Sequence, residues 1–505
     1  MKKSRKVFCT IFAIVLAISS VLTSYAYQGD IKENSVLDDL SCEIVVPTLY
    51  NDKSDLEILE NVAGIDVEKL EEHILTAVTN HEQTISLEEF NISISNDVFD
   101  ALSAFIFEEI EEAFHVNTFT MWKNSTKYLY IEPKYFYDEA EYKGMMDECN
   151  KVTEKIIDGV KDNNNLSDAE KALIIHDRLS VICSYDHDAA KLAKAEDPAF
   201  SMYGALVEGS AVCQGYSEAY NYLLKKVGIK SHLCTSDALV HAWNIVYIDG
   251  KPYHVDVTWD DGEVNGSVYH NCFLLSTDAL YKGVNGGDGH VANDYDKSPV
   301  STKYDNYYWQ NSTTAFQLID NEIYYIDNEA KQLIRESDGK VLCSVEDRWL
   351  YDSDYSYWPG NYSKLSSDGK NLLYTDTENV YKYNLETNRT TVVFSPDLSV
   401  GSYYSIFGMA YDGKYIVCDL FNSPNVDTEN LMKHDKKAYS VGDDILVGDV
   451  NGDGEVNSKD VTVIGRALSG GWNIAIDYEI FDCDENGSFN AKDVSMVRRI
   501  AAGGW

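Results

Sequence analysis

Apolar residues recur at three- and four-residue spacing directly behind Cys213, and this pattern predicts a helix over residues 214–227. The positions that carry the pattern are Ala219, Leu223, Leu224 and Val227. Gly228 then stands where a helix C′ residue belongs. Cys213 is therefore expected at or just before a helix N-terminus, where unpaired backbone N–H groups favour an ionised, nucleophilic thiol. A buried structural cysteine is the alternative if this segment is taken alone.

A second pattern follows, in which two β-rich runs at 241–248 and 251–259 flank an Asp-Gly pair. This arrangement predicts a hairpin, and a two-residue loop would set Trp243 opposite Asp256. His241 and Asp256 would then be diagonal neighbours on one face, roughly 7–8 Å apart at the backbone. The opposite face is apolar and is expected to face the core; it carries Ala242, Val246, Ile248, Tyr253, Val255 and Val257. A three-residue loop would break this geometry.

A thiol at a helix start beside a carboxylate-oriented imidazole is the arrangement that thiol acyl chemistry requires. Asp256 would hold His241 in one tautomer and favour its protonated form. His241 would take the proton of Cys213 and later give it to the leaving group. The three residues are therefore candidates for a catalytic triad.

The motifs around these residues resemble those of the transglutaminase-like superfamily, in its bacterial, secreted, protease-like branch. The Cys motif reads VCQGY at 212–216, the His motif HAWN at 241–244 and the Asp motif YHVDVTWD at 253–260. The resemblance extends upstream through 166–186 and 203–207. It implies a papain-like catalytic core within residues 135–300, with Cys213 as nucleophile, His241 as base and Asp256 as orienting group. The backbone N–H of Cys213 is the natural oxyanion donor, and Tyr203 is a candidate for a second.

The chain has 505 residues, which predicts several domains rather than one core. It opens with four basic residues before an apolar run at 7–22 and the small-residue end Ser24-Tyr25-Ala26. This pattern predicts a signal peptide, residues 1–26, and an exported protein. A retained membrane anchor is the alternative, because the run is near the lower limit for a membrane span.

The formal net charge is −41, from 83 acidic and 42 basic residues. Such a surface repels polyphosphates and anionic lipid, so roles in binding nucleic acid or membrane surfaces are disfavoured. Ten cysteines are present, one of them inside the predicted signal peptide, and none is in a Cys-x-x-Cys metal motif. The odd number that remains fits one free reactive thiol, although several unpaired ones fit as well.

Residues 27–134 are predicted to form an α+β N-terminal region, with helices near 56–80 and 97–113 and strands near 118–121 and 128–131. Its acidic run, Glu108, Glu109, Glu111 and Glu112, is interpreted as a solvated helix face. In the core, residues 138–162 have helical spacing, and Ser167 with Glu170 forms a capping box that opens another helix. His176 and Asp177 in that helix are interpreted as structural rather than metal-binding.

Residues 301–440 change to short aromatic strands and a loose repeat, in which Asp320, Asp368 and Asp412 occupy equivalent turns. The spacing of these turns is typical of propeller blades, and three units are fewer than a closed propeller needs. We therefore expect an open, propeller-like β-rich segment. The overall prediction is an α+β multidomain chain with a papain-like core, this segment and a small all-α calcium-binding module.

That last module is predicted from two calcium-loop motifs whose oxygen donors stand at loop positions 1, 3, 5, 7, 9 and 12. The first comprises Asp449, Asn451, Asp453, Glu455, Asn457 and Asp460, and the second Asp482, Asp484, Asn486, Ser488, Asn490 and Asp493. Each motif has glycine at position 6 and leads into a short helix, at 461–468 and 494–501. Hard oxygen ligands in a flexible loop select Ca²⁺, so two ions are expected.

Residues 447–505 resemble a type I dockerin, the module that attaches secreted enzymes to a cohesin on a cellulosome scaffold, the setting of polysaccharide catabolism. The resemblance implies a cohesin partner. Candidate contacts are Ser458, Lys459, Arg466, Ala491, Lys492, Arg498 and Arg499. Lysine in both loops departs from the hydroxyl pairs common there, which leaves the cohesin class open.

Three functions are consistent with the sequence. The first is a secreted cysteine hydrolase, a thiol protease or amidase acting on a protein or peptide. The second is a protein-glutamine transamidase, since an acyl-enzyme can pass to an amine instead of water. The third is a catalytically inert cellulosomal adaptor. Nothing in the sequence enforces exclusion of water, which favours hydrolysis.

Overall fold

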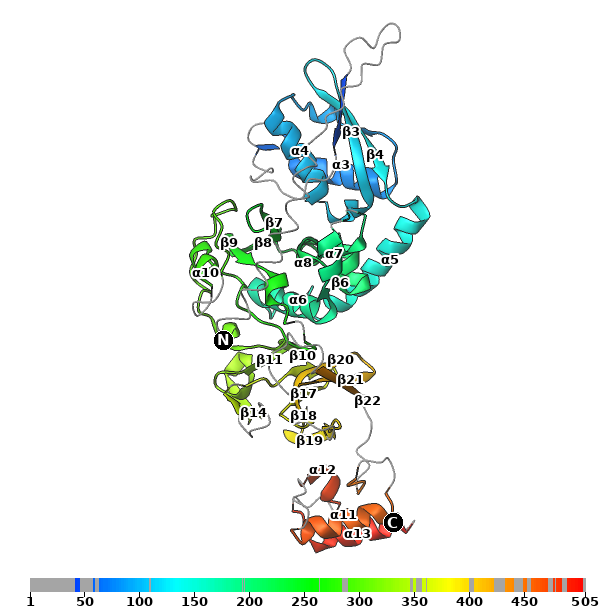
Figure 1. Ribbon diagram of the computed structural model, residues 1–505, viewed down its shortest axis with the longest axis vertical. Helices are drawn as coiled ribbons and strands as arrows, with labels where there is room; N and C mark the ends of the chain where they lie inside the picture. The colour runs from blue at the N-terminus through cyan, green and yellow to red at the C-terminus, as the bar shows by residue number, and fades with distance from the viewer. Residues whose placement is uncertain are drawn as a thin grey trace. The chain divides into compact units, whose positions relative to one another are not determined.

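The computed structural model of the protein describes most of the chain from residue 41 onward (Figure 1). The described residues are 41–45, 58–59, 63–108, 110–192, 194, 196–262, 264–283, 289–345, 348–350, 357–359, 361–398, 404–421, 432–439, 448–451, 456–470, 476, 478–483 and 488–502. The predicted signal peptide lies outside them. Within these ranges, no helix has the length and apolar character needed to cross a membrane.

The chain divides into two compact units. The first contains residues 1–261 and 271–306, and the second contains 262–270 and 307–505. This division is coarser than the predicted one, because the N-terminal region and the core belong to one unit.

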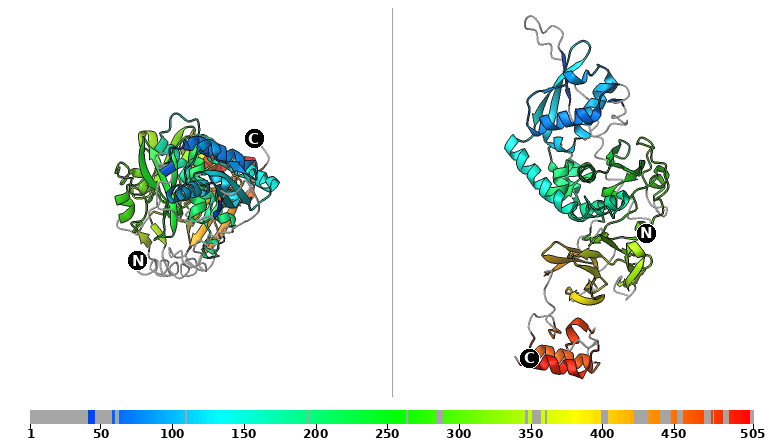
Figure 2. Two further views of the ribbon diagram at one scale, coloured as in Figure 1. Left: turned by 90° about the horizontal axis from the view of Figure 1, so that it is seen from above. Right: turned by 180° about the vertical axis from the view of Figure 1, so that it is seen from behind.

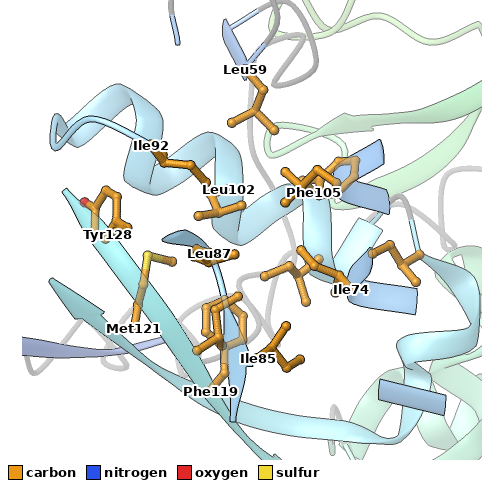
Figure 3. Close-up of a cluster of buried hydrophobic side chains, with 14 of the residues drawn as sticks. Leu59, Ile74, Ile85, Leu87, Ile92, Leu102, Phe105, Phe119, Met121 and Tyr128 are labelled. Carbon is orange, nitrogen blue, oxygen red and sulfur yellow. The ribbon is translucent and has the colours of Figure 1, made fainter. Parts of the chain in front are cut away.

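The N-terminal region is an antiparallel sheet with strand order β1-β3-β4-β2, packed with two helices. The strands are β1 (Ser41–Val45), β2 (Ile85–Ser86), β3 (Val116–Lys123) and β4 (Tyr128–Tyr135), and the helices are α3 (Val67–Thr79) and α4 (Asn96–Glu108), with 3₁₀ turns η2 (Glu88–Phe90) and η3 (Glu111–His115). Figure 3 shows the apolar side chains between sheet and helices, among them Ile74, Leu102 and Phe119. The two predicted strands are confirmed, and both predicted helices are shorter than expected.

The interpretation of the acidic run as a solvated face was wrong for Glu111 and Glu112, whereas the side chains of Glu108 and Glu109 lie outside the described part of the chain. Glu111 and Glu112 are only 2% and 6% exposed. The chain leaves α4 and turns through η3, which carries both side chains inward toward the helix that begins at Cys213. There the Asn221 amide donates to Glu111, and Lys226 pairs with Glu112 at 3.4 Å. These contacts compensate the burial only in part, because one oxygen of each carboxyl group has no hydrogen-bond partner among the described residues.

The rest of the first unit is built on a three-stranded antiparallel sheet, β7-β8-β9, against which a central helix packs. The strands are β7 (Ser231–Ser236), β8 (His241–Ile248) and β9 (Lys251–Val255), and a parallel pair is formed by β5 (Ser184–Tyr185) and β6 (Ser210–Ala211). The helices are α5 (Glu139–Ile156), α6 (Asp168–Ile182), α7 (His187–Leu192), α8 (Cys213–Lys226), α9 (Val257–Asp260) and α10 (Thr277–Lys282), with short turns η4 (Pro198–Phe200) and η5 (Gly204–Glu208). The predicted capping box is present at the start of α6.

The predicted repeat of the second unit corresponds to three successive antiparallel meanders, and the described strands of this unit form no closed propeller. They are β10 (Gln317–Ile319), β11 (Glu322–Asp327), β12 (Gln332–Arg335), β13 (Lys340–Ser344); β16 (Leu365–Ser367), β17 (Asn371–Thr375), β18 (Val380–Asn384), β19 (Arg389–Phe394); and β20 (Ser405–Tyr411), β21 (Tyr415–Phe421), β22 (Met432–Ala438). A separate pair is β14 (Arg348–Leu350) with β15 (Tyr357–Pro359), and 3₁₀ turns occur at η7 (Tyr308–Asn311) and η8 (Glu336–Asp338). Asp320, Asp368 and Asp412 each lie in the first hairpin of their meander.

The chain's last described segment is helical, with α11 (Ser458–Leu468), α12 (Tyr478–Phe481) and α13 (Ala491–Ala501). Helices α11 and α13 lie side by side in Figure 1 and Figure 2. Their shared core contains Ile464, Phe481 and Val497. Both helices start with the same capping box, an Asn followed three residues later by an Asp. This symmetry is what two copies of one loop–helix motif produce.

Candidate active site

Helix α8 begins at Cys213, as predicted, and ends at Lys226 with Gly228 just beyond it at a φ of +79°. Val212 is the N-cap residue in extended conformation, and its N–H donates to the Ala199 carbonyl at 2.9 Å. A Cβ at Gly215 would lie 2.6 Å from that same carbonyl oxygen. Glycine at this position therefore lets the η4 turn pack directly against the first turn of α8. The N–H of Cys213 has no acceptor inside its own helix, because first-turn N–H groups never do.

The hairpin that carries His241 has the predicted two-residue loop. Asp249 and Gly250 both take positive φ, 52° and 71°, as a type I′ turn requires. The observed pairing runs from Ile248 with Lys251 to Asn244 with Val255, which is the predicted register.

Beyond Val255 the prediction of a continuing strand was wrong. Asp256 is the N-cap of α9, and its Oδ1 accepts the Trp259 N–H at 3.1 Å. Thr258 is therefore helical and does not pair with His241. The cap fixes the Asp256 carboxyl group more firmly than a strand position would, because one oxygen is held by backbone and the other is left for the imidazole.

The structure brings the three predicted triad residues together. His241 Nε2 lies 2.6 Å from Asp256 Oδ2. Cys213 lies close enough to His241 to contribute to the raised pKa of its imidazole. Because Asp256 occupies Nε2, Nδ1 is the ring nitrogen that remains for the thiol. All three residues are buried, with Asp256 0% exposed.

The charges at this site favour an ionised Asp256 and a protonated His241. Burial alone would lower the pKa of His241, but the charge and hydrogen bond of Asp256, with a contribution from Cys213, raise it to about 10. Burial would raise the pKa of Asp256, but the charge of His241 and hydrogen bonds from two imidazoles hold it below its ordinary value. These charges therefore keep the imidazole of His241 protonated at neutral pH.

Strand β8 is buried on both faces, whereas one apolar core face was expected. On one side Asn244 donates to the Ser217 carbonyl of α8 at 3.0 Å. On the other side Trp243 and Ile245 pack with Leu280 of α10. Strand β8 is therefore enclosed between two layers, and this enclosure restricts the movement of His241.

Two residues that the sequence reasoning missed lie at the site. His290 Nε2 is 2.8 Å from Asp256 Oδ2, the oxygen that His241 also contacts. Tyr185 is paired with Ala211, two residues before Cys213. Burial and then the charges of Cys213 and Asp256 raise the pKa of Tyr185 above its ordinary value. The sequence signal for Tyr185 was the upstream motif at 166–186; none pointed to His290.

Tyr203 is placed differently from what an oxyanion donor needs in this conformation. Its hydroxyl donates to Glu148 Oε2 at 2.9 Å. Burial and that carboxyl group raise the pKa of Tyr203 to about 12. A role at the oxyanion would require this hydrogen bond to break, so the role stays a prediction.

Burial makes six of the other described cysteines poor nucleophiles, because it raises the pKa of each thiol. Eight cysteines whose side chains the structure describes form no disulfide bond: Cys149, Cys183, Cys213, Cys234, Cys272, Cys343, Cys418 and Cys483. Burial raises the pKa of both Cys149 and Cys183 to about 12. Cys213 is distinguished from them by its place at a helix start and by its imidazole partner.

Comparison with known families also points to a transglutaminase-like core in this part of the chain. Residues 151–257, which contain all three triad residues, match the model of the Transglutaminase-like superfamily. The chain carries a transglutaminase-like core.

Residues 447–500 match the Dockerin type I domain. Both matches are to the families that the motifs resembled. The comparison with curated proteins gives no match.

Two solved structures are similar to part of the chain. A structure described as a TGase is 18% identical, with a TM-score of 0.20, and the match covers 27% of this chain and 42% of that one. A protein assigned as a cysteine protease from Cytophaga hutchinsonii is 13% identical, with a TM-score of 0.18, and the match covers 28% and 58%. The chain therefore spans less than two thirds of either structure.

In the transglutaminase-like core, helix α8 also carries a buried acid, Glu218. Its two carboxyl oxygens accept from the Gln214 side chain at 2.8 Å and from the Met202 N–H at 3.2 Å. Burial raises the pKa of Glu218 to about 8 and that of Glu111 to about 7. Both groups are therefore at least partly protonated in the folded unit at neutral pH.

This burial predicts a pH dependence of stability. A carboxyl group whose pKa is raised on folding stabilises the unit at low pH and loses that effect as pH rises through the folded pKa. The unfolding midpoint of the core is therefore expected to fall by several degrees between pH 5 and 9. Glu218→Gln should flatten this slope, measured by thermal unfolding across that range. Glu68→Gln, which changes an exposed acid, should leave the slope as it is; an equal effect of both variants would contradict the assignment.

The dockerin segment buries four of its predicted metal ligands. Asp449, Asp460, Asp482 and Asp493 are at most 8% exposed. Asp460 accepts the Asn457 N–H at 2.9 Å, and Asp493 accepts the Asn490 N–H at 2.7 Å. Of the other predicted ligands, Asn451 and Ser488 are exposed, and Asp453, Glu455, Asp484 and Asn486 lie outside the described residues.

Buried carboxylates at loop positions 1 and 12 fit calcium, because burial of like charges is costly unless a cation compensates it. The type I dockerin match supports Ca²⁺ in this segment. The predicted cohesin contacts are all exposed on α11 and α13: Ser458, Lys459, Arg466, Ala491, Lys492, Arg498 and Arg499.

Proposed function

We propose that the protein is a secreted, cellulosome-associated cysteine enzyme that cleaves peptide or amide bonds by acyl transfer. The observation that carries this proposal is the contact of Cys213, His241 and Asp256 in one buried site. A thiol, an imidazole and a carboxylate in this order are the groups that acyl transfer requires. The dockerin supports the setting, since its family attaches secreted enzymes to a scaffold cohesin.

The geometry allows the following sequence of steps. Cys213 Sγ attacks the carbonyl carbon of the bound amide, while His241 Nδ1 holds the thiol proton. The Cys213 backbone N–H donates to the oxyanion that forms. When the C–N bond breaks, His241 transfers the proton to the departing amine, which leaves a thioester on Cys213. A water molecule then attacks the thioester and gives its proton to His241, and the acid is released as the thiol re-forms.

A tyrosine near the site is the candidate for a second hydrogen-bond donor to the oxyanion. Tyr203 is the sequence candidate, but its hydroxyl is engaged by Glu148. Tyr185 is a further candidate because its ring packs with Val212, the residue before the nucleophile. Its position supports a donor role more directly than that of Tyr203.

The choice between water and amine as acyl acceptor is tested with one incubation. Casein is mixed with the full chain and a fluorescent primary amine, and both peptide fragments and labelled casein are measured. We expect more peptide fragments than labelled casein, because Cys213 retains 9% exposure and water can therefore reach the acyl group. Labelled, uncleaved casein would assign a transamidase instead. If neither peptide fragments nor labelled protein form with any protein substrate, the inert adaptor is the function that remains.

A further inference from the structure

His290 lies at the triad although it is far from it in the chain. Its Nε2 contacts Asp256 Oδ2 at 2.8 Å, and His241 Nε2 contacts the same oxygen at 2.6 Å. The other oxygen of Asp256 accepts the Trp259 N–H. Asp256 thus accepts hydrogen bonds from His241, His290 and Trp259. Only His241 is the residue that Asp256 is proposed to orient.

The ring of His290 is fixed in place by its surroundings. Its backbone N–H donates to the Leu280 carbonyl at 3.0 Å, and its carbonyl accepts the Tyr295 hydroxyl at 2.9 Å. The ring packs against Trp259 at 4.1 Å and Trp243 at 4.8 Å between centroids. The side chain is fully buried, so its orientation toward Asp256 is set by packing rather than by chance contact.

A glycine before His290 makes this close approach sterically feasible. A Cβ at Gly289 would lie 2.3 Å from the Tyr281 carbonyl oxygen and 2.6 Å from that of Leu280. The backbone of 289–290 therefore lies directly against the end of α10. A side chain at 289 would push the imidazole away from the carboxylate.

The two imidazoles on Asp256 differ in charge. Burial lowers the pKa of His290 and outweighs the attraction of Asp256, with the positive charges of His241 and Lys297 acting in the same direction as burial. His290 is therefore a neutral donor through Nε2–H, and its buried Nδ1 has no hydrogen-bond partner among the described residues. Because His290 is neutral, the positive charge beside the Asp256 carboxylate is on His241, which also lies next to Cys213.

We propose that His290 is a positioning residue of the acyl-transfer site, a neutral hydrogen-bond donor that fixes and keeps ionised the carboxylate of Asp256. This proposal rests on the proposed function. Without His290, Asp256 would be free to rotate about its side-chain bonds and would gain a proton at higher pH. Either change weakens the hold on His241 and thus its ability to take the proton of Cys213.

The test compares His290→Leu, which removes the donor, with His290→Gln, which retains an N–H at similar reach. His254→Leu is the matched control, because it removes another fully buried imidazole of the same core that does not bond to Asp256. We expect His290→Leu to lower kcat for casein hydrolysis by about tenfold to a hundredfold with little change in KM. His290→Gln should recover most of that loss.

A second readout does not depend on turnover. The rate of alkylation of Cys213 by iodoacetamide is followed from pH 4 to 10 by peptide mass spectrometry. The acid limb of this profile should move to higher pH in His290→Leu and return in His290→Gln, while His254→Leu keeps the wild-type profile. A profile in His290→Leu that equals that of His254→Leu would overturn the proposal. Absence of hydrolysis in the wild type would instead overturn the proposed function, and the alkylation profile would still decide the role of His290.

Discussion

Replacing Cys213 with alanine is expected to reduce casein hydrolysis by a factor on the order of 10³ to 10⁶. The sulfur is the atom that forms the thioester, and neither His241 nor Asp256 can take its place once it is gone. The measurement is the initial rate of fragment release by full-length protein. The unfolding midpoint of the variant should stay close to that of the wild type, since only one sulfur atom is lost from a site that is 9% exposed.

Cys149→Ala is the matched control for this variant. Cys149 is a fully buried thiol of α5 in the same unit, and it is not part of the triad. Its replacement should leave the rate within about twofold, although the core loses some stability to the cavity. Undiminished hydrolysis by Cys213→Ala would place the chemistry elsewhere in the chain.

Removal of calcium is expected to unfold the dockerin segment and to weaken cohesin binding by at least about a hundredfold. Asp449, Asp460, Asp482 and Asp493 are buried carboxylates, and without a cation their burial is no longer compensated. Binding to an immobilised cohesin is measured before and after addition of excess chelator, and limited proteolysis reports the folding of residues 448–502.

The core serves as the internal control for this experiment. The triad contains no oxygen cage for calcium, so casein hydrolysis should continue at an unchanged rate in chelator. Asp460→Ala alone should reproduce part of the loss of binding. Full cohesin binding in excess chelator would contradict the calcium assignment.

Much of the candidate site could be predicted because local signals agreed with one another. The Asp249-Gly250 pair fixes a two-residue turn, and the turn fixes the register of the strands on either side. The helical spacing behind Cys213 likewise gave the helix start within one residue. Turn and helix signals depend on a few neighbouring residues, so they can be read without the tertiary structure.

The predictions that were wrong concern residues whose surroundings are formed by distant segments of the chain. The strand pattern continues past Asp256 in the sequence. A short side chain with a carboxyl group can also cap a helix, and in the structure Asp256 is the N-cap of α9 instead of a strand residue. Glu111 and Glu112 look solvent-exposed in sequence, yet partners more than a hundred residues away bury them. His290 gave no signal because its only link to the triad is spatial.

The repeat of the β-rich segment could be predicted, and the open, propeller-like arrangement of its units stays a prediction. Asp320, Asp368 and Asp412 mark equivalent hairpins because the Asp side chain or a positive φ suits a tight turn. Whether successive meanders close into a ring depends on sheet-to-sheet packing, which turn residues do not encode. The segment is thus described as three meanders of four, four and three strands in the part of the chain that the structure covers.

If Cys213, His241 and Asp256 form one acyl-transfer centre, a covalent intermediate on Cys213 can be trapped. The full chain is mixed with an activated peptide ester, quenched in acid within milliseconds to seconds, digested and mapped by mass spectrometry. We expect an acyl adduct on Cys213 alone, with slower formation in His241→Ala and in Asp256→Ala. An adduct on another cysteine, or turnover of the ester with Cys213 unmodified at every time point, would contradict this assignment.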